Sequence, residues 1–195
     1  MTVKAKHGLG RRGAAVRAAV LEATLAELVE HGIDGVTVAA VAARAGVHET
    51  SVYRRWRTRE DLIVDALLER SAAQIPAPDT GSVRGDLVQL ARLVSTYLST
   101  PLGRALLPMG ALTVADESLA QARANFIASR FAAMRVVVDR AIERGELLAG
   151  TNARLVLEML VAPLHVRTIL TGEPLPDTLP EQLVDVLLDG LRPRR

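Results

Sequence analysis

Apolar residues recur in the first third of this chain at the three- and four-residue spacing of amphipathic helices. The pattern predicts helices over residues 13–31, 37–45 and 49–56. Gly32 follows the first helix as a left-handed stop, and Gly46 separates the second helix from the third. No segment keeps the alternation of apolar and polar residues that marks a half-buried strand, so we expect helices throughout.

The helical spacing continues toward the C-terminal end, with one interruption. Thr58-Arg59-Glu60-Asp61 has the pattern of a capping box and predicts the start of a fourth helix. Proline and glycine gather in residues 74–81, which we interpret as a linker, and the predicted domain boundary falls between residues 74 and 75. Further helices are expected over residues 82–99, 117–144, 152–170 and 180–191, with a short irregular piece over 104–116.

Composition supports an all-α fold and argues against several classes of function. Hydrophobic residues make up 49% of the chain but include few aromatics, so Ala, Leu and Val must form the core. The chain has no cysteine, and its four histidines lack the spacing of metal ligands. Because we also find no nucleophile with a base and no glycine-rich phosphate loop, we expect no enzyme, no metal site and no cofactor.

The pattern of apolar residues also bears on the location of the protein. No apolar run approaches the roughly 18 residues that are needed to cross a bilayer. The charged first residues are not followed by the apolar segment of a secretory signal. We therefore expect a cytoplasmic protein without contact to a membrane.

Charge is distributed unevenly along the chain. Residues 1–59 contain ten Lys or Arg and five Asp or Glu, whereas residues 60–195 contain fourteen and seventeen. A basic N-terminal part suggests a polyanionic partner such as nucleic acid. A solvated basic tail explains the charge alone equally well.

Residues 37–56 have the features of a helix-turn-helix. Two short helices are joined at Gly46, and the small Ala42 and Ala43 allow them to cross closely. Three apolar residues anchor the second helix: Val47, Val52 and Trp56. Its remaining positions are polar and free to contact a partner: His48, Thr50, Ser51, Tyr53 and Arg54.

The residue types on and around this second helix suit DNA. Arginine binds guanine edges in the major groove, and Ser, Thr and Tyr hold phosphates or bases. Thr37 and Arg59 lie at helix starts, where backbone N–H groups favour phosphate. Five arginines fall within sixteen residues whose only acid is Glu49: Arg44, Arg54, Arg55, Arg57 and Arg59. A solvated basic face is the alternative, but the turn pattern favours a DNA-binding site.

Residues 32–56 resemble the TetR family of bacterial transcriptional regulators, which includes AcrR-like members, and the family pattern continues through residues 58–62. The resemblance implies an Ω-shaped, all-α homodimer that is usually a repressor, released from a palindromic operator in double-stranded DNA by a small-molecule ligand. The expected organisation is a three-helix helix-turn-helix domain over residues 1–74 and a helical ligand-binding and dimerisation domain over residues 75–195. Residues 1–12 form a predicted flexible basic arm, which either reaches the adjacent minor groove or is a solvated tail.

The resemblance also implies roles for single residues. Positions that commonly hold phosphates correspond to Thr37, Tyr53 and Arg59, and positions that face the groove correspond to His48, Thr50, Ser51 and Arg54. Together with Arg44 from the arginine cluster, these are the predicted DNA contacts. Many members have Ser in place of His48 and a basic residue in place of Glu49. Because Glu49 repels phosphate, we expect it to read a cytosine or to turn away.

The sequence is less informative about residues 75–195. The segment 152–170 is apolar nearly all round and therefore needs two buried faces. With the apolar side of residues 180–191 it predicts a four-helix interface between two subunits, which is also where the TetR family dimerises.

A ligand pocket is expected between the long helix over 117–144 and its neighbours, since small molecules bind in apolar cavities with a few polar groups. Six residues are candidates for this pocket: Tyr97, Met109, Phe126, Arg130, Met159 and His165. For each of them, ordinary core or surface packing is the alternative. The sequence does not distinguish a repressor from an activator, because the sign of regulation depends on operator position.

Overall fold

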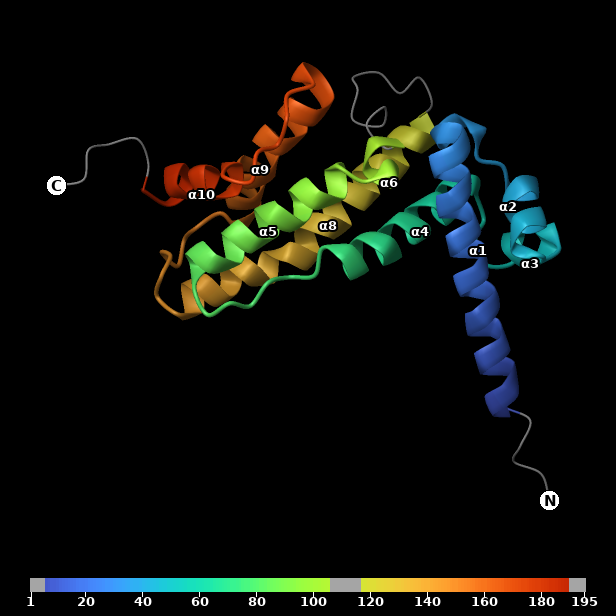
Figure 1. The fold of residues 1–195 in the computed structure, drawn as a ribbon. Coiled ribbons are helices and arrows are strands. Elements are labelled where there is room, and N and C mark those ends of the chain that lie inside the picture. The colour runs from blue at the N-terminus through green and yellow to red at the C-terminus, as the bar shows by residue number, and fades with distance from the viewer. Residues whose placement is uncertain (1–5, 106–116, 190–195) are drawn as a thin grey trace.

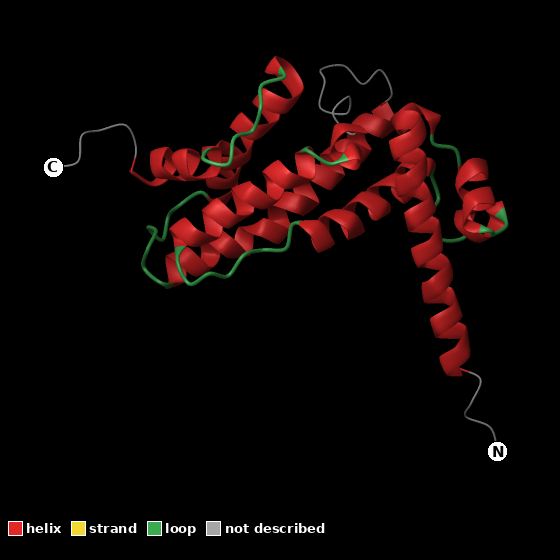
Figure 2. Ribbon diagram, viewed as in Figure 1, coloured by secondary structure: helices red, strands yellow, loops and turns green. Residues whose placement is uncertain are grey.

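The computed structural model describes residues 6–105 and 117–189, with side chains from residue 13 onward. Within these ranges every regular element is a helix (Figure 2), and the all-α prediction is confirmed. None of the described helices combines the length and the apolar character that a membrane span requires.

The N-terminal helices are α1 (Lys6–Gly35), α2 (Val38–Ala45), α3 (Glu49–Tyr53) and α4 (Arg59–Gln74). The short α2 and α3 lie together beside the long α1, and α4 runs from α1 toward the rest of the molecule (Figure 1). Gly32 interrupts α1 with a left-handed φ of 68°, as predicted, although one last turn reaches Gly35.

The structure corrects the predicted start of the first helix. The helix begins at Lys6 rather than near residue 13, so residues 6–12 of the predicted arm are helical. Extension of an existing helix adds a backbone hydrogen bond per residue without a new nucleus, which explains why the helix continues through a glycine-containing segment. Residues 1–5 lie outside the described part.

The C-terminal helices are α5 (Val83–Leu98), α6 (Pro101–Ala105), α8 (Glu117–Glu143), α9 (Ala153–His165), a π-helical turn η1 (Val166–Thr171) and α10 (Leu179–Asp189). Helices α5 and α8 pack against each other, and α9 and α10 cover α5 at the far end from α1 (Figure 1). The predicted helix over 152–170 is thus an α-helix only to His165, and it continues as a π-helix beyond Pro163.

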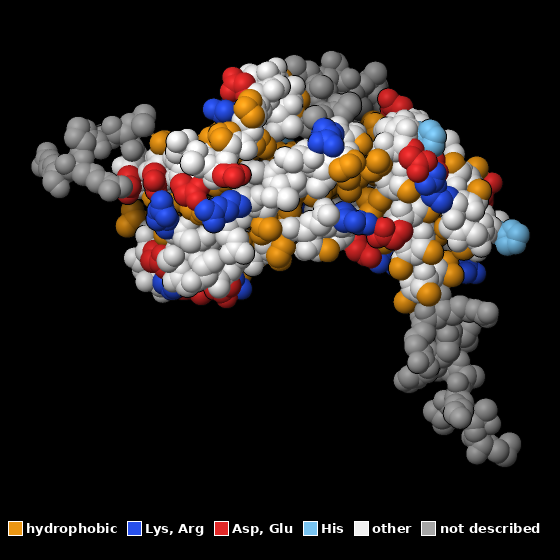
Figure 3. Space-filling view, viewed as in Figure 1, with side chains coloured by type: hydrophobic (Ala, Val, Ile, Leu, Met, Phe, Trp, Pro, Cys, Tyr) orange, Lys and Arg blue, Asp and Glu red, His pale blue; other side chains and the backbone are white. Residues whose placement is uncertain are grey.

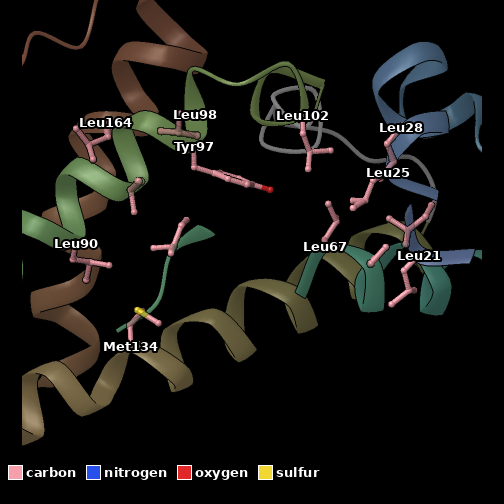
Figure 4. Close-up of a cluster of buried hydrophobic side chains, with 14 of the residues drawn as sticks. Leu21, Leu25, Leu28, Leu67, Leu90, Tyr97, Leu98, Leu102, Met134 and Leu164 are labelled. Atoms are coloured by element: carbon pink, nitrogen blue, oxygen red, sulfur yellow. The ribbon is translucent and has the colours of Figure 1, made fainter. Parts of the chain in front are cut away.

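A single apolar core of mainly Leu, Val and Ala extends through both domains. Its N-terminal part contains Leu21, Leu25 and Leu28 of α1 next to Leu67 of α4, and its C-terminal part contains Leu90 and Met134 (Figure 4). Because α4 packs on both α1 and α8, this helix connects the N-terminal helices to the C-terminal helices. A change in the position of α4 therefore affects both the N-terminal and the C-terminal helices.

Candidate nucleic-acid interface and ligand pocket

The turn between α2 and α3 is fixed by local hydrogen bonds. Gly46 takes the left-handed conformation (φ 66°), its N–H donates to the Ala43 carbonyl, and the Val47 N–H donates to the Ala42 carbonyl at 3.0 Å. This pair of bonds is a Schellman motif, in which glycine avoids the strain of a positive φ. The start of α2 is capped by Thr37, whose hydroxyl oxygen accepts from the Ala40 N–H at 3.1 Å.

The predicted anchors hold α3 against the domain core. Val52 and Trp56 are 1% and 7% exposed, and Val47 is half-buried. The Trp56 indole N–H donates to the Asp65 carboxylate of α4 at 2.9 Å, and Arg17 of α1 donates to the other oxygen of the same carboxylate at 2.8 Å. Asp65 therefore joins the segment after α3 to α1 and α4.

The polar side of α3 faces solvent. Among the predicted contacts on this helix, His48, Thr50, Tyr53 and Arg54 are exposed and Ser51 is half-buried. His48 is the N-cap residue, but its side chain makes no capping hydrogen bond, so the imidazole is available to a partner. The arrangement agrees with a groove-facing surface.

Three arginines at and after the end of α3 carry uncompensated charge. Arg54, Arg55 and Arg57 are exposed, and no carboxylate of the described residues pairs with any of them. Elsewhere on the molecule, basic and acidic side chains lie next to one another, over α1 and over the C-terminal helices in the view of Figure 3. The end of α3 is thus a locally unbalanced positive surface of the kind that binds phosphate.

Arg44 lies in a different environment from the one predicted. Its guanidinium donates to Glu27 at 2.7 Å and to both oxygens of Glu30, so it joins α2 to α1. These hydrogen bonds raise the pKa of Arg44 and lower the pKa of Glu30. Since Glu27 is only 5% exposed, it needs this cation inside the protein. Glu27, Glu30 and His31 lie close enough together to hold a metal ion, but Arg44 already occupies both carboxylates.

Arg59 is also engaged within the protein. Its Nε donates to Glu60 at 2.9 Å, and its Nη1 lies 3.4 to 3.5 Å from the carbonyls of Ile33, Asp34 and Val36 at the end of α1. The sequence gives no sign of the three carbonyl contacts, because these partners are separated from Arg59 by more than twenty residues. A phosphate contact from Arg59 remains a prediction, whereas Thr37 keeps its hydroxyl proton free to donate.

The C-terminal domain contains a pocket of about 150 Å³ between α4, α5, α8 and α9. Four of the six predicted ligand residues line it together: Tyr97, Phe126, Arg130 and His165. Met159 does not, because it lies on the opposite side of α9 and is 53% exposed. Met109 lies outside the described residues. Sequence reasoning missed the contribution of α4, whose Ser71 and Ile75 are spaced by one helical turn.

The pocket is apolar with four polar side chains in its wall: Ser71, Tyr97, Arg130 and His165. The buried Tyr97 hydroxyl has no hydrogen-bond partner among the described residues, and burial raises its pKa above 10, so it keeps its proton. The half-buried Arg130 donates to the Ile75 carbonyl at 2.9 Å. His165 Nδ1 bonds to the Val161 carbonyl at 2.9 Å, which requires a proton on Nδ1 and, in a neutral ring, leaves Nε2 as an acceptor. The pocket therefore offers a ligand two hydrogen-bond donors, the Tyr97 hydroxyl and the Arg130 guanidinium, and one acceptor, His165 Nε2.

Comparisons with known proteins agree with this geometry. Residues 20–66 match the family described as bacterial regulatory proteins, tetR family, and residues 77–187 match the tetracyclin repressor-like, C-terminal domain. The chain is 38% identical to the HTH-type transcriptional regulator AqdR of Rhodococcus erythropolis over 92% of its own length and 86% of the relative's. It is 32% identical to the DNA-binding transcriptional repressor TetR of Mycobacteroides abscessus, over 93% and 97%.

Two solved structures show the same fold. The TetR family transcription regulator SCO0332 superimposes with a TM-score of 0.79 at 30% identity, over 91% of this chain and 99% of the other. The transcriptional regulator FadR from Bacillus subtilis, in complex with stearoyl-CoA, shares only 16% identity at a TM-score of 0.61, over 90% and 99%. The helix-turn-helix, its unpaired arginines and these matches lead to one conclusion: the chain belongs to the TetR family of DNA-binding transcriptional regulators.

Proposed function

We propose that this protein is a dimeric repressor that binds a palindromic operator through α3 and leaves it when a small molecule occupies the pocket. The observation that carries the proposal is the unpaired charge of Arg54, Arg55 and Arg57 beside the exposed polar side of α3. We assign base reading to His48, Thr50, Ser51 and Arg54. Phosphate contacts fall to Thr37, Tyr53 and Arg57, and the protein acts in the cytoplasm, where its DNA is.

An apolar stripe on α9 and η1 supports the dimer. Five residues share this outward side at spacings of three and four positions: Leu155, Met159, Ala162, Val166 and Leu170. The four large ones are 44 to 64% exposed, and Val186 of α10 adds a further 50% exposed side chain. The opposite side of α9 carries the buried Leu157, Leu160 and Leu164. Such a two-sided apolar helix is stable only when a second surface covers the outward stripe.

Helix α4 supports the coupling between ligand and DNA. In the first half of this helix, Asp65 accepts a hydrogen bond from Trp56, which anchors the reading helix. At its other end, Ser71 and Ile75 line the pocket. A ligand that displaces the end of α4 therefore changes the position of α3, and affinity for the operator falls because two linked half-sites no longer fit together.

The experiment that tests DNA binding is selection of bound fragments from random double-stranded DNA by the purified full-length chain. A palindromic motif with half-sites about one helical turn apart, or a multiple of that, and with a steep loss of affinity in salt is expected. Competition with RNA polymerase at a promoter that contains the motif then distinguishes a repressor from an activator. Recovery of no motif by a well-folded dimer contradicts the proposal.

The dimer is tested by Met159→Lys, which places a charge in the middle of the exposed stripe. We expect sedimentation velocity to detect monomer and operator affinity to fall, because one half-site alone has few contacts. Leu148→Lys is the matched control, since Leu148 is 84% exposed but lies outside the stripe. Equal behaviour of the two variants would place the dimer interface elsewhere.

A further inference from the structure

The pocket between α4, α5, α8 and α9 contains a cation that no acid among the described residues balances. Arg130 is half-buried on α8, and its one hydrogen bond to a described residue goes to the neutral carbonyl of Ile75. No carboxylate among the described residues pairs with it. Burial lowers its pKa, but a guanidinium stays charged at neutral pH. A partly desolvated charge without a counter-ion is unfavourable, and a bound anion would relieve it.

A second donor lies in the same wall. The Tyr97 ring points from α5 toward Leu67 of α4 and Leu102 of α6 (Figure 4), and its buried hydroxyl has no partner in the described part of the molecule. Buried polar groups in native proteins are nearly always hydrogen-bonded, so an orphaned one marks a place where a ligand atom or a water belongs. Tyr97 and Arg130 line the same pocket, and both side chains are hydrogen-bond donors. These two donors favour a ligand with an oxygen atom that accepts hydrogen bonds.

Size and polarity restrict the rest of the ligand. Apart from Tyr97, Arg130, His165 and Ser71, the wall consists of Ile, Leu, Val, Phe and Met side chains. The volume of about 150 Å³ is close to that of a known apolar cavity that takes a single benzene ring. Typical drug-sized pockets are several times larger. The ligand that fits therefore has one ring or a short hydrocarbon chain.

We propose that the effector is a compact apolar monocarboxylate, whose hydrocarbon part fills the pocket and whose carboxylate accepts hydrogen bonds from Arg130 and the Tyr97 hydroxyl. This inference rests on the proposed function and names the ligand chemistry for its pocket. It also gives Arg130 a second role. When its guanidinium turns to the carboxylate, the Ile75 carbonyl at the end of α4 loses its donor, and that end of α4 is released.

The test compares acids with neutral molecules of the same shape. Benzoate and hexanoate are titrated into the purified dimer beside benzamide and hexanamide, and binding is measured by calorimetry or by saturation-transfer NMR. A charge-assisted pair with arginine contributes about tenfold or more in Kd, so the acids are expected to bind that much more tightly than the amides. Equal binding of acids and amides, or no saturable binding of either acid, overturns the proposal.

Two variants and one control locate the effect. Arg130→Gln and Tyr97→Phe are each expected to weaken binding of the acids while that of the amides changes little. Arg135→Gln makes the same change five positions later on α8, at a side chain that is 70% exposed and outside this pocket. This control should leave the binding of acids and of amides unchanged. Equal effects of Arg130→Gln and Arg135→Gln would contradict the assignment. If Arg130→Gln does not fold, Tyr97→Phe, which keeps the ring, carries the same test.

Failure here is distinguishable from failure of the proposed function. Operator binding is measured on the same preparations by fluorescence anisotropy, without and with each acid. A protein that selects an operator but does not discriminate acids from amides remains a DNA-binding regulator with a different ligand. A protein that binds the acids but selects no DNA sequence loses the regulatory proposal and keeps the ligand assignment.

Discussion

Arginines in two parts of the helix-turn-helix domain have opposite environments. Arg44 and Arg59 lie where α2 and α4 meet α1, and each is bonded to carboxylates or carbonyls of the protein. Arg54, Arg55 and Arg57 lie at and after the end of α3 and have no carboxylate partner among the described residues. The first group holds the helices together, whereas the second has charge left for an external partner.

The same distinction applies to the C-terminal domain. Arg144 lies 3.2 Å from the fully buried Asp86 and also bonds to Glu146 at the surface, so it stabilises the fold. Arg130, in the pocket wall, has the Ile75 carbonyl as its one hydrogen-bond partner within the described ranges. In both domains, therefore, the presence or absence of an internal counter-ion among the described residues separates structural arginines from those that we propose as ligand contacts. Residue type and spacing in the sequence do not show which arginines have an internal counter-ion.

The largest expected effect is that of Arg54→Ala on operator affinity. Loss of an arginine that contacts a base edge costs about 1–3 kcal/mol of binding free energy, or roughly 5- to 150-fold in Kd. The free energy of unfolding should stay within about 0.5 kcal/mol of wild type, because Arg54 is exposed and unpaired. Arg135→Ala removes an equally exposed charge from α8 and serves as control. Equal Kd values for both variants would show that Arg54 does not touch DNA.

Arg44→Ala should produce the reverse pattern. The variant leaves the buried Glu27 with only His31, 3.1 Å away, so the midpoint of thermal unfolding is expected to fall below that of Arg54→Ala. The salt dependence of DNA binding by the folded fraction should not change. If the slope of log Kd against log salt falls while stability is unchanged, Arg44 contacts phosphate and does not belong with the structural arginines.

Arg57→Ala should weaken binding of every DNA sequence by a similar, smaller factor. A phosphate contact is independent of sequence, and its loss lowers the slope of log Kd against log salt by about 1. The measurement is a salt titration on the selected operator and on an unrelated duplex. A change confined to the operator would instead assign Arg57 to base reading.

The smallest effect concerns the clamp between Glu30 and Arg44. The hydrogen bond from Arg44 lowers the pKa of Glu30 below its usual 4.5. The Glu30–Arg44 ion pair therefore contributes fully to stability above pH 4.5, and this contribution is lost as the pH falls through the lowered pKa of Glu30. The difference in stability between wild type and Glu30→Gln should shrink in the same range. Glu143→Gln, at an exposed carboxylate with no ion pair to a described residue, should show no comparable difference.

Local features of the fold were predictable from the sequence because they depend on neighbouring residues. Thr37 and Thr58 cap α2 and α4 through bonds to the residues three positions on, and Gly46 forms the turn that its lack of a side chain permits. The anchors Val52 and Trp56 follow from helical spacing.

Features that depend on distant partners were not predictable. Arg44 looked like a DNA contact because its partner Glu27 lies seventeen residues away in the sequence. Met159 looked like a pocket residue because α9 is apolar on both sides, and only packing decides which side faces α5 and α8. The place of Ile75 in the pocket was unpredictable for the same reason, because its partner Arg130 on α8 is distant in the sequence.

The central claim is that unpaired arginines at α3 read DNA. It is tested most directly by parallel selection from random double-stranded DNA with wild type and Arg54→Ala. We expect a palindromic motif from the wild type, and from the variant the same motif with preference lost at one position in each half-site. An identical motif from both proteins, at equal affinity, would contradict the claim.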